Sequence, residues 1–130
     1  MSTFNAIGVA GTGVTVYRKW LDAVSDNIAN MDNVSRTSEN AFQARYILAQ
    51  EAQDGNGAQV GGVAFGSAEG VLVHEPDNPL ADGQGYVRKP DIDLGSQMAQ
   101  MMMAQRAYQA NLAVVDRAKD SYNAAINLGK

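Results

Sequence analysis

Apolar side chains recur at alternating steps of three and four residues near both ends of this 130-residue chain. Near the start they are Ile7, Ala10, Val14, Tyr17, Leu21, Val24, Ile28 and Met31. Near the end they are Met98, Met101, Tyr108, Leu112, Val115, Tyr122 and Ile126, with polar Gln105 and Lys119 as two interruptions. A 3.5-residue repeat places each set on one narrow seam of a helix. We therefore expect two long terminal helices that pack along these seams as a left-handed coiled coil.

Local signals set the expected limits of both helices. A Ser/Thr/Asn cap is available near Thr3–Asn5, and the first helix should end near Met31–Asn33, because the run Asn30–Asn33 favours turns. The second helix should run from about Leu94 to Leu128, because Gly129 is a natural stop. Three glycines near the start of the first helix each cost about 1 kcal/mol relative to alanine. That end is expected to become ordered only against neighbouring molecules.

The middle of the chain predicts a small β element. Alternation at Phe42, Ala44, Tyr46 and Leu48 indicates one strand, and Val60, Val63, Phe65, Val71 and Val73 indicate one or two more. Asp54–Gly57 is a good hairpin turn, because such turns need residues with positive φ, which glycine adopts readily. Pro76, Pro79 and Pro90 are expected to hold an extended loop that leads to the second helix.

The predicted fold is therefore mainly α with a small β element. Residues 1–34 and 91–130 should form one helical core domain. Residues 35–90 should form an inserted, glycine-rich β-hairpin and loop segment.

Charge and composition exclude several classes of function. The net charge is −4 with no basic stripe, which disfavours nucleic-acid binding. No apolar run approaches eighteen residues, so no membrane insertion is expected, and the start lacks the basic region of a secretory signal. The chain has no cysteine, which excludes disulfides, thiolate metal sites and thiol catalysis.

No residue pattern predicts an enzyme, a metal site or a cofactor. His74 is the only histidine and lacks partners at ligand spacing, so a surface or strand-end position is favoured. The acidic residues Asp77, Asp82, Asp91 and Asp93 do not have calcium-loop spacing. The methionines at positions 98 and 101–103 widen the apolar seam, which indicates a helix that touches several neighbours more than a soft-metal site.

Two segments resemble the signatures of the bacterial flagellar axial protein family. Leu21–Asn30 is similar to the N-terminal signature, which ends in Asn-Ile-Ala-Asn, and Ala104–Asn111 is similar to the C-terminal signature. Gly85–Val87, followed by Pro90–Asp93 and Met98, resembles the approach to that helix in proximal-rod members. The chain departs from many relatives at Asn33–Thr37, which replaces a Thr-Pro-Gly-Tyr motif. It departs again at Gln97, where an acidic residue is usual.

The resemblance implies a structural subunit of the flagellar basal-body rod, within the periplasm, that stacks helically with copies of itself and other rod proteins. It also implies secretion through the flagellar type III export apparatus without signal cleavage. The residues expected to carry helix packing and assembly are Ile7, Val14, Tyr17, Leu21, Val24, Ile28, Asn30, Met98, Met101, Tyr108, Asn111, Leu112, Val115, Tyr122 and Ile126.

Two other classes of function remain as alternatives. A soluble coiled-coil adaptor or export chaperone would share the heptad helices, but should be a stable helical dimer in isolation. A small hydrolase would need a convergent polar pocket, for which the sequence offers no candidate group.

Overall fold

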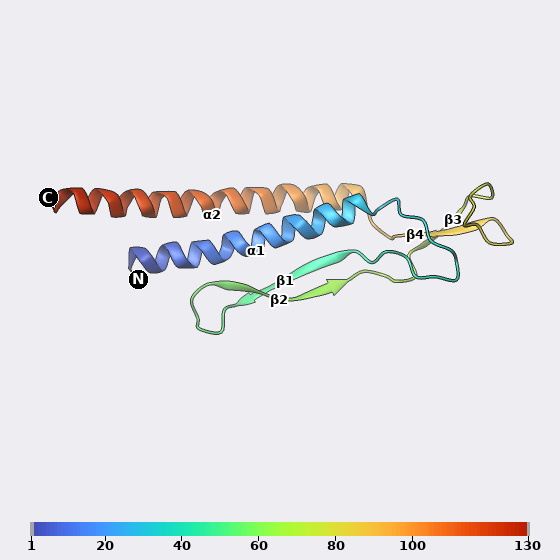
Figure 1. Cartoon of the computed structure of the whole chain (residues 1–130), viewed down its shortest axis with the longest axis horizontal. Coiled ribbons are helices and arrows are strands. Elements are labelled where there is room, and N and C mark those ends of the chain that lie inside the picture. The colour runs from blue at the N-terminus through green and yellow to red at the C-terminus, as the bar shows by residue number, and fades with distance from the viewer. Residues whose placement is uncertain (1, 130) are drawn as a thin grey trace.

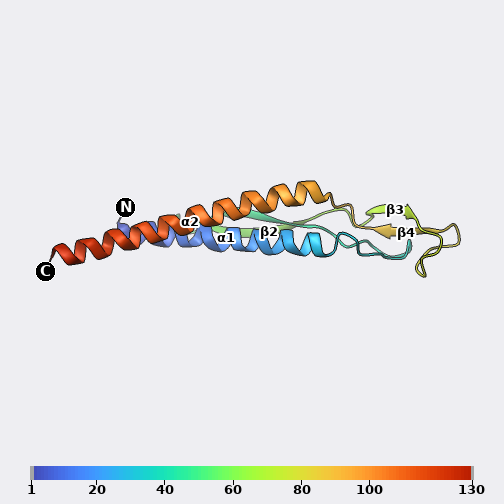
Figure 2. The same cartoon turned by 90° about the horizontal axis from the view of Figure 1, so that it is seen from above.

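The protein is elongated, with the two helices side by side and the β hairpins beside and beyond them (Figures 1 and 2). The structure, a computed structural model, describes residues 2–129. Its elements are α1 (Thr3–Ala29), β1 (Arg45–Glu51), β2 (Ala58–Phe65), β3 (Val71–His74), β4 (Tyr86–Lys89) and α2 (Leu94–Leu128). The predicted fold class, two long packed helices with a small β element, is confirmed.

Side-chain caps define the helix ends. The Ser2 hydroxyl accepts the Asn5 backbone N–H at 3.2 Å, and the Asp93 carboxylate accepts the Ser96 N–H at 2.7 Å. At the end of α1 the Asn30 side chain donates to the Asp26 carbonyl at 2.8 Å. The α2 limits agree with the prediction, whereas α1 ends slightly before the expected turn because Asn30 is already its C-cap.

The two helices pack antiparallel along most of α1. The Phe4 and Tyr122 rings meet edge to face with centroids 4.8 Å apart at one end. At the other end Asn27 is bonded to Gln97. Because α2 is longer, its last residues extend past the start of α1 (Figure 1).

The β1–β2 hairpin lies along α1, which places α1 between the hairpin and α2 (Figure 1). The strands pair antiparallel, with a bulge that leaves Gly61 unpaired. At the hairpin tip the Ala58 N–H donates to the Thr12 hydroxyl at 3.0 Å, and that hydroxyl donates to the Val9 carbonyl at 2.6 Å. The hairpin is therefore anchored to α1 at its tip as well as at its base.

The segment before α2 corrects one prediction. Pro76–Pro90 was expected to be an extended loop, but Tyr86–Lys89 forms β4, which pairs antiparallel with β3. Ser35 bridges to Arg88 on the other side of β4. Val87 is completely buried, so burial and two-sided pairing stabilise a strand that four residues of sequence could not predict.

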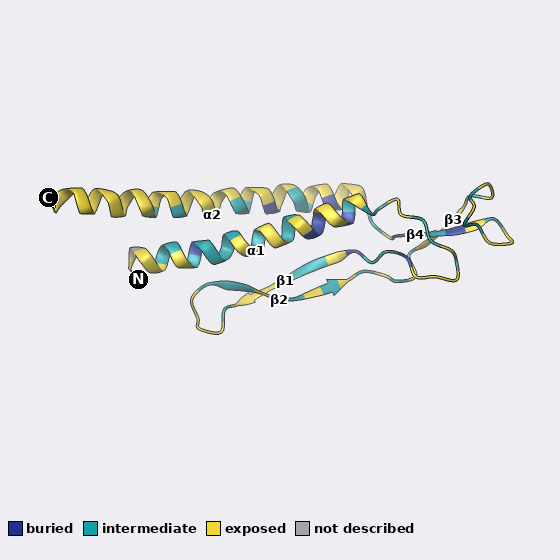
Figure 3. Ribbon diagram, in the orientation of Figure 1, coloured by how far each residue is buried: buried dark blue, intermediate teal, exposed yellow. Residues whose placement is uncertain are grey.

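Buried residues concentrate where α1, α2 and the start of β1 meet (Figure 3). They include Val24, Asn27, Ala41, Ala44, Gln97 and Ala104. Toward the other end of the helix pair burial falls, and residues 121–129 are all exposed. The chain is thus well packed at one end of the helix pair and open at the other.

Candidate assembly surface

Small and polar residues fill the centre of the contact between α1 and α2. Gly13 approaches the Asn111 side chain so closely that a Cβ would lie 3.0 Å from it. Trp20 donates from its indole nitrogen to Gln100 at 3.4 Å. Ala104, opposite this stretch, is completely buried. Small side chains let the two helix backbones approach closely, so the seam runs through them.

On α2 this seam differs from the predicted one. At half of the predicted positions, the residue that faces α1 is the one immediately before the predicted residue. The heptad column of α2 that faces α1 is Gln97, Ala104 and Asn111, of which Gln97 and Ala104 are buried and Asn111 is half-buried. Met98 and Leu112, one position further along, are 52% and 37% exposed. Met101, Tyr108 and Val115, which also belong to the predicted seam, are half-buried. Gln105 and Lys119 are exposed and so do not interrupt the contact.

Asn27 joins three elements through its side-chain amide. Its Oδ1 accepts the Arg45 backbone N–H at 2.8 Å, and its Nδ2 donates to the Arg45 carbonyl at 2.9 Å. Nδ2 also donates to Oε1 of Gln97 at 3.0 Å. Both Asn27 and Gln97 are almost fully buried. The amide therefore fixes where β1 begins relative to the helix pair.

Asn27 and Gln97 were both missing from the predicted packing residues. Periodicity analysis selects apolar residues, so a buried amide at seam spacing is read as an interruption. The one available signal was that Asn27 begins the Asn-Ile-Ala-Asn run. The structure gives Asn30, which was selected, the local role of α1 cap.

A flank of the helix pair remains open on the side away from the hairpin. The hairpin faces α1 through Thr12, Val16 and Ala23. Helical geometry places Ile7, Val14, Leu21 and Ile28 on the opposite flank of the seam. All four are half-buried, so α2 covers them only in part. Met98, Leu112 and Ile126 lie on the same flank of α2. These residues are therefore available to another helix.

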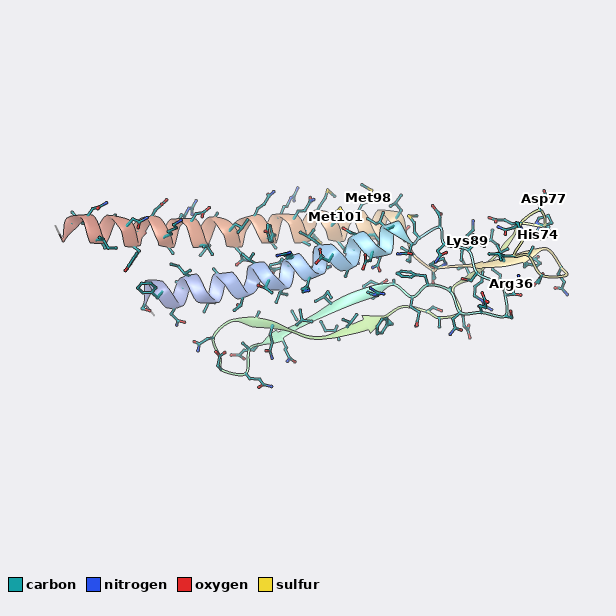
Figure 4. The ribbon with its side chains drawn as sticks, in the orientation of Figure 1. Arg36, His74, Asp77, Lys89, Met98 and Met101 are labelled. Atoms are coloured by element: carbon teal, nitrogen blue, oxygen red, sulfur yellow. The ribbon has the colours of Figure 1, made fainter. Side chains whose placement is uncertain are left out.

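The first two thirds of α2 are almost uncharged and expose several large apolar side chains. Between Leu94 and Val115 the only charged side chain is Arg106. Because α1 covers only one face of α2, Met102 and Met103 on the outer surface are 53% and 59% exposed. Figure 4 shows Met98 and Met101 close to the start of this helix. A patch of large apolar side chains exposed on one helix is typical of an interaction surface, so this part of α2 is a candidate contact surface.

The open end of the helix pair also exposes apolar groups. Tyr122, Ile126 and Leu128 of α2 are exposed, as is Phe4 of α1. Leu128 is 89% exposed. This end lacks the buried residues that stabilise the other end, so fewer packing contacts hold it in place.

The β3–β4 tip uses its titratable groups for local structure. His74 packs against Tyr86 with ring centroids 5.0 Å apart. The ion pair with Lys89, at 2.5 Å, and a hydrogen bond from Asn78 lower the pKa of Glu75. Backbone N–H groups of Tyr86 and Gln84 lower the pKa of Asp82. Figure 4 places His74, Asp77, Lys89 and Arg36 together at this end of the molecule.

The described residues hold no cluster of three His, Asp or Glu side chains that could bind a metal ion. An apolar groove of about 190 Å³ lies between α1 and the hairpin. Its lining is Gly13, Val16, Tyr17, Trp20, Ile47, Ala49 and Ala58, which brings no acid or base together. Within residues 2–129 no helix has the length and hydropathy needed to cross a membrane.

Comparisons with known proteins agree with this architecture. The family model described as "Flagellar basal body rod FlgEFG protein C-terminal" matches residues 84–128, which comprise β4 and α2. The flagellar basal-body rod protein FlgC of Salmonella typhimurium is 33% identical over 134 residues, covering 100% of both chains. The FlgC proteins of Escherichia coli O157:H7 and Bacillus subtilis are 34% and 26% identical, again over 100% of both chains.

The antiparallel terminal helices with exposed apolar flanks, together with these matches, define a structural protein of the flagellar basal-body rod. Within that class the chain belongs to the FlgC family of rod proteins.

Proposed function

We propose that this rod subunit assembles helically, through its two terminal helices, with copies of itself and with other rod proteins to form the hollow drive shaft. The observation that carries the proposal is the exposed apolar surface of α2 between Leu94 and Val115. Its large apolar side chains that are more than 40% exposed are Leu94, Met98, Met102, Met103 and Val114, and Arg106 is the only charged side chain in this segment. Burying apolar surface contributes about 25 cal/mol per Å², so enclosure of this helix strongly favours assembly.

The assembly contacts combine the flank residues with the helix ends. The contact residues that we propose are Ile7, Val14, Leu21, Ile28, Met98, Met101, Leu112, Tyr122 and Ile126. Tyr17, Val24, Asn30, Tyr108, Asn111 and Val115 would act indirectly, because they hold the helix pair in the geometry that presents this surface. A contact between two different surfaces of identical subunits, repeated without closing on itself, generates a helical assembly.

The secretion route is a further part of the proposal. The subunit would leave the cell through the flagellar type III export apparatus without cleavage of a signal, and take its place in the rod within the periplasm. The first seventeen residues carry no charged side chain and include three glycines. A segment with few buried contacts and low helix propensity unfolds at small cost, which suits passage through a narrow channel.

Replacing Met102 by Asp tests the assembly surface. Met102 is half-exposed in the subunit, so Met102→Asp should leave the fold intact. In the assembled rod it would bury a carboxylate without a partner, which costs several kcal/mol. We expect loss of rod formation and motility in a strain that carries only this variant.

The matched control is Asn123→Asp. Asn123 lies three heptads further along the same column of α2, is exposed, and follows Asp116 in that column. This variant should swim normally. Motility of Met102→Asp at the control level would contradict the enclosure of α2.

Sedimentation of the purified protein distinguishes a rod subunit from the alternative function. An adaptor or chaperone should be a stable dimer, whereas a rod subunit should be a monomer.

A further inference from the structure

The methionine face of α2, formed by Met98 and Met102, has no partner within the described chain. Both side chains are more than half exposed, and they lie one helical turn apart on the flank away from the hairpin. Methionine is flexible and polarisable, so such a face adapts to a closely approaching partner. The partner must be weakly charged, because α2 offers only Arg106 to pair with between Leu94 and Val115.

One segment of the same chain meets these requirements. Residues 1–17 carry no charged side chain. Gly8 and Gly11, one turn apart on α1, leave hollows on its surface: among the described residues no atom beyond the local helix backbone lies within 4 Å of where their Cβ atoms would be. Two methionine side chains spaced by one turn match two hollows spaced by one turn.

The intramolecular geometry prevents this match within one chain. Phe4 meets Tyr122 and Gly13 approaches Asn111, so Gly8 lies level with residues near 117. Met102 lies about fifteen residues nearer the start of α2, which is roughly 22 Å away at 1.5 Å per residue. The uncharged part of α1 and the uncharged part of α2 therefore lie toward opposite ends of the subunit.

We propose that the Gly8–Gly11 face of α1 in one subunit docks onto the Met98–Met102 face of α2 in a second copy, displaced along the shaft by about 22 Å. This inference rests on the proposed helical assembly and specifies its contact. Copies with a common orientation keep α2 of the second copy antiparallel to α1 of the first, so Gly8 meets Met102 while Gly11 meets Met98. The contact is head-to-tail and repeats without closing.

The absence of cysteine from the sequence makes disulfide cross-linking a direct test. The double variant Gly8→Cys/Met102→Cys is expressed in place of the native protein, and assembled basal bodies are oxidised and analysed without reductant. Disulfides need Cα atoms within about 7 Å, so this pair can close only between subunits. We expect disulfide-linked dimers and larger species of this chain. Their yield should be at least about tenfold higher than from the control pair, which should not meet the same distance requirement.

The control is Gly8→Cys/Asp120→Cys, because Asp120 is equally exposed but lies in the charged part of α2. A second pair, Gly11→Cys/Met98→Cys, covers the case in which one glycine variant fails to assemble. If assembled rods give no homodimer with either pair, the contact is overturned while rod assembly itself stands. Cross-linking only to a different rod protein also overturns the assignment to a second copy. Ser25→Leu is a further control at another position of α1. If rods form with Ser25→Leu but with neither cysteine pair, the result supports the close approach of the two helices at Gly8 and Gly11.

Discussion

The side-chain amide of Asn27 donates to Oε1 of Gln97, 3.0 Å away, and so joins the two terminal helices at their buried end. The same amide makes two hydrogen bonds with the Arg45 backbone, at 2.8 and 2.9 Å. One buried side chain thereby sets both the register of the helix pair and the start of the hairpin. Buried amide networks of this kind favour one arrangement because any shift leaves polar groups unpaired.

Asn27→Ala should destabilise the subunit by roughly 3 kcal/mol, because it removes the partner of the part-buried Arg45 N–H and carbonyl and of the buried Gln97 Oε1. Asn30→Ala is the control, since it removes one local hydrogen bond at the α1 cap and should cost about 1 kcal/mol. Urea unfolding followed by circular dichroism measures both. Equal losses in the two variants would show that the Asn27 amide is not a structural centre.

Gln97→Glu should make stability fall as pH rises. The new carboxyl would be almost completely buried, which raises its folded-state pKa above the unfolded value. The folded state then binds more protons, so stability is retained in acid and lost above the unfolded pKa, by on the order of 2 kcal/mol at neutral pH. Gln105→Glu, an exposed position on the same helix, should show no such slope. Unfolding at pH 4 and pH 7 compares the two variants.

The β3–β4 tip should loosen in acid. The pKa of Glu75 is lowered chiefly by Lys89, and that of Asp82 by backbone N–H groups. A depressed folded-state pKa contributes stability above the unfolded pKa, which is about 4, and that contribution is lost as pH falls through the folded value. Hydrogen exchange of the β4 amides, corrected for the pH dependence of the intrinsic exchange rate, should show a loss of protection below about pH 4. Glu75→Gln should reduce this pH dependence; an unchanged profile would argue against the ion pair.

Gly57→Ala should destabilise the hairpin tip by about 2 kcal/mol, because the backbone there has positive φ and Thr12 occupies the place of a Cβ. Gly62→Ala is the matched control on the same hairpin. It has ordinary φ and open space for a Cβ, so its effect should stay within about 0.5 kcal/mol. Thermal unfolding compares the variants. A neutral Gly57→Ala would indicate that the tip is not held against α1.

Local sequence signals determined the elements that depend on near neighbours. The end of α2 follows from Gly129, and the hairpin turn follows from the Asp54–Gly57 run, where Gly55 and Gly57 adopt positive φ. Each signal acts within a few residues, so a linear pattern is sufficient to read it.

Tertiary structure decided which side of each helix faces which partner. The sequence pattern selected Met98 and Leu112 for the seam because they are large and apolar. Close packing of the two backbones instead favours Ala104 and the hydrogen-bonded Gln97. It also decided that β4 is a strand, since its pairing with β3 and Ser35 joins residues distant in sequence. Side-chain size and hydrogen-bond partners across an interface are properties of two segments together, and periodicity along one segment does not contain them.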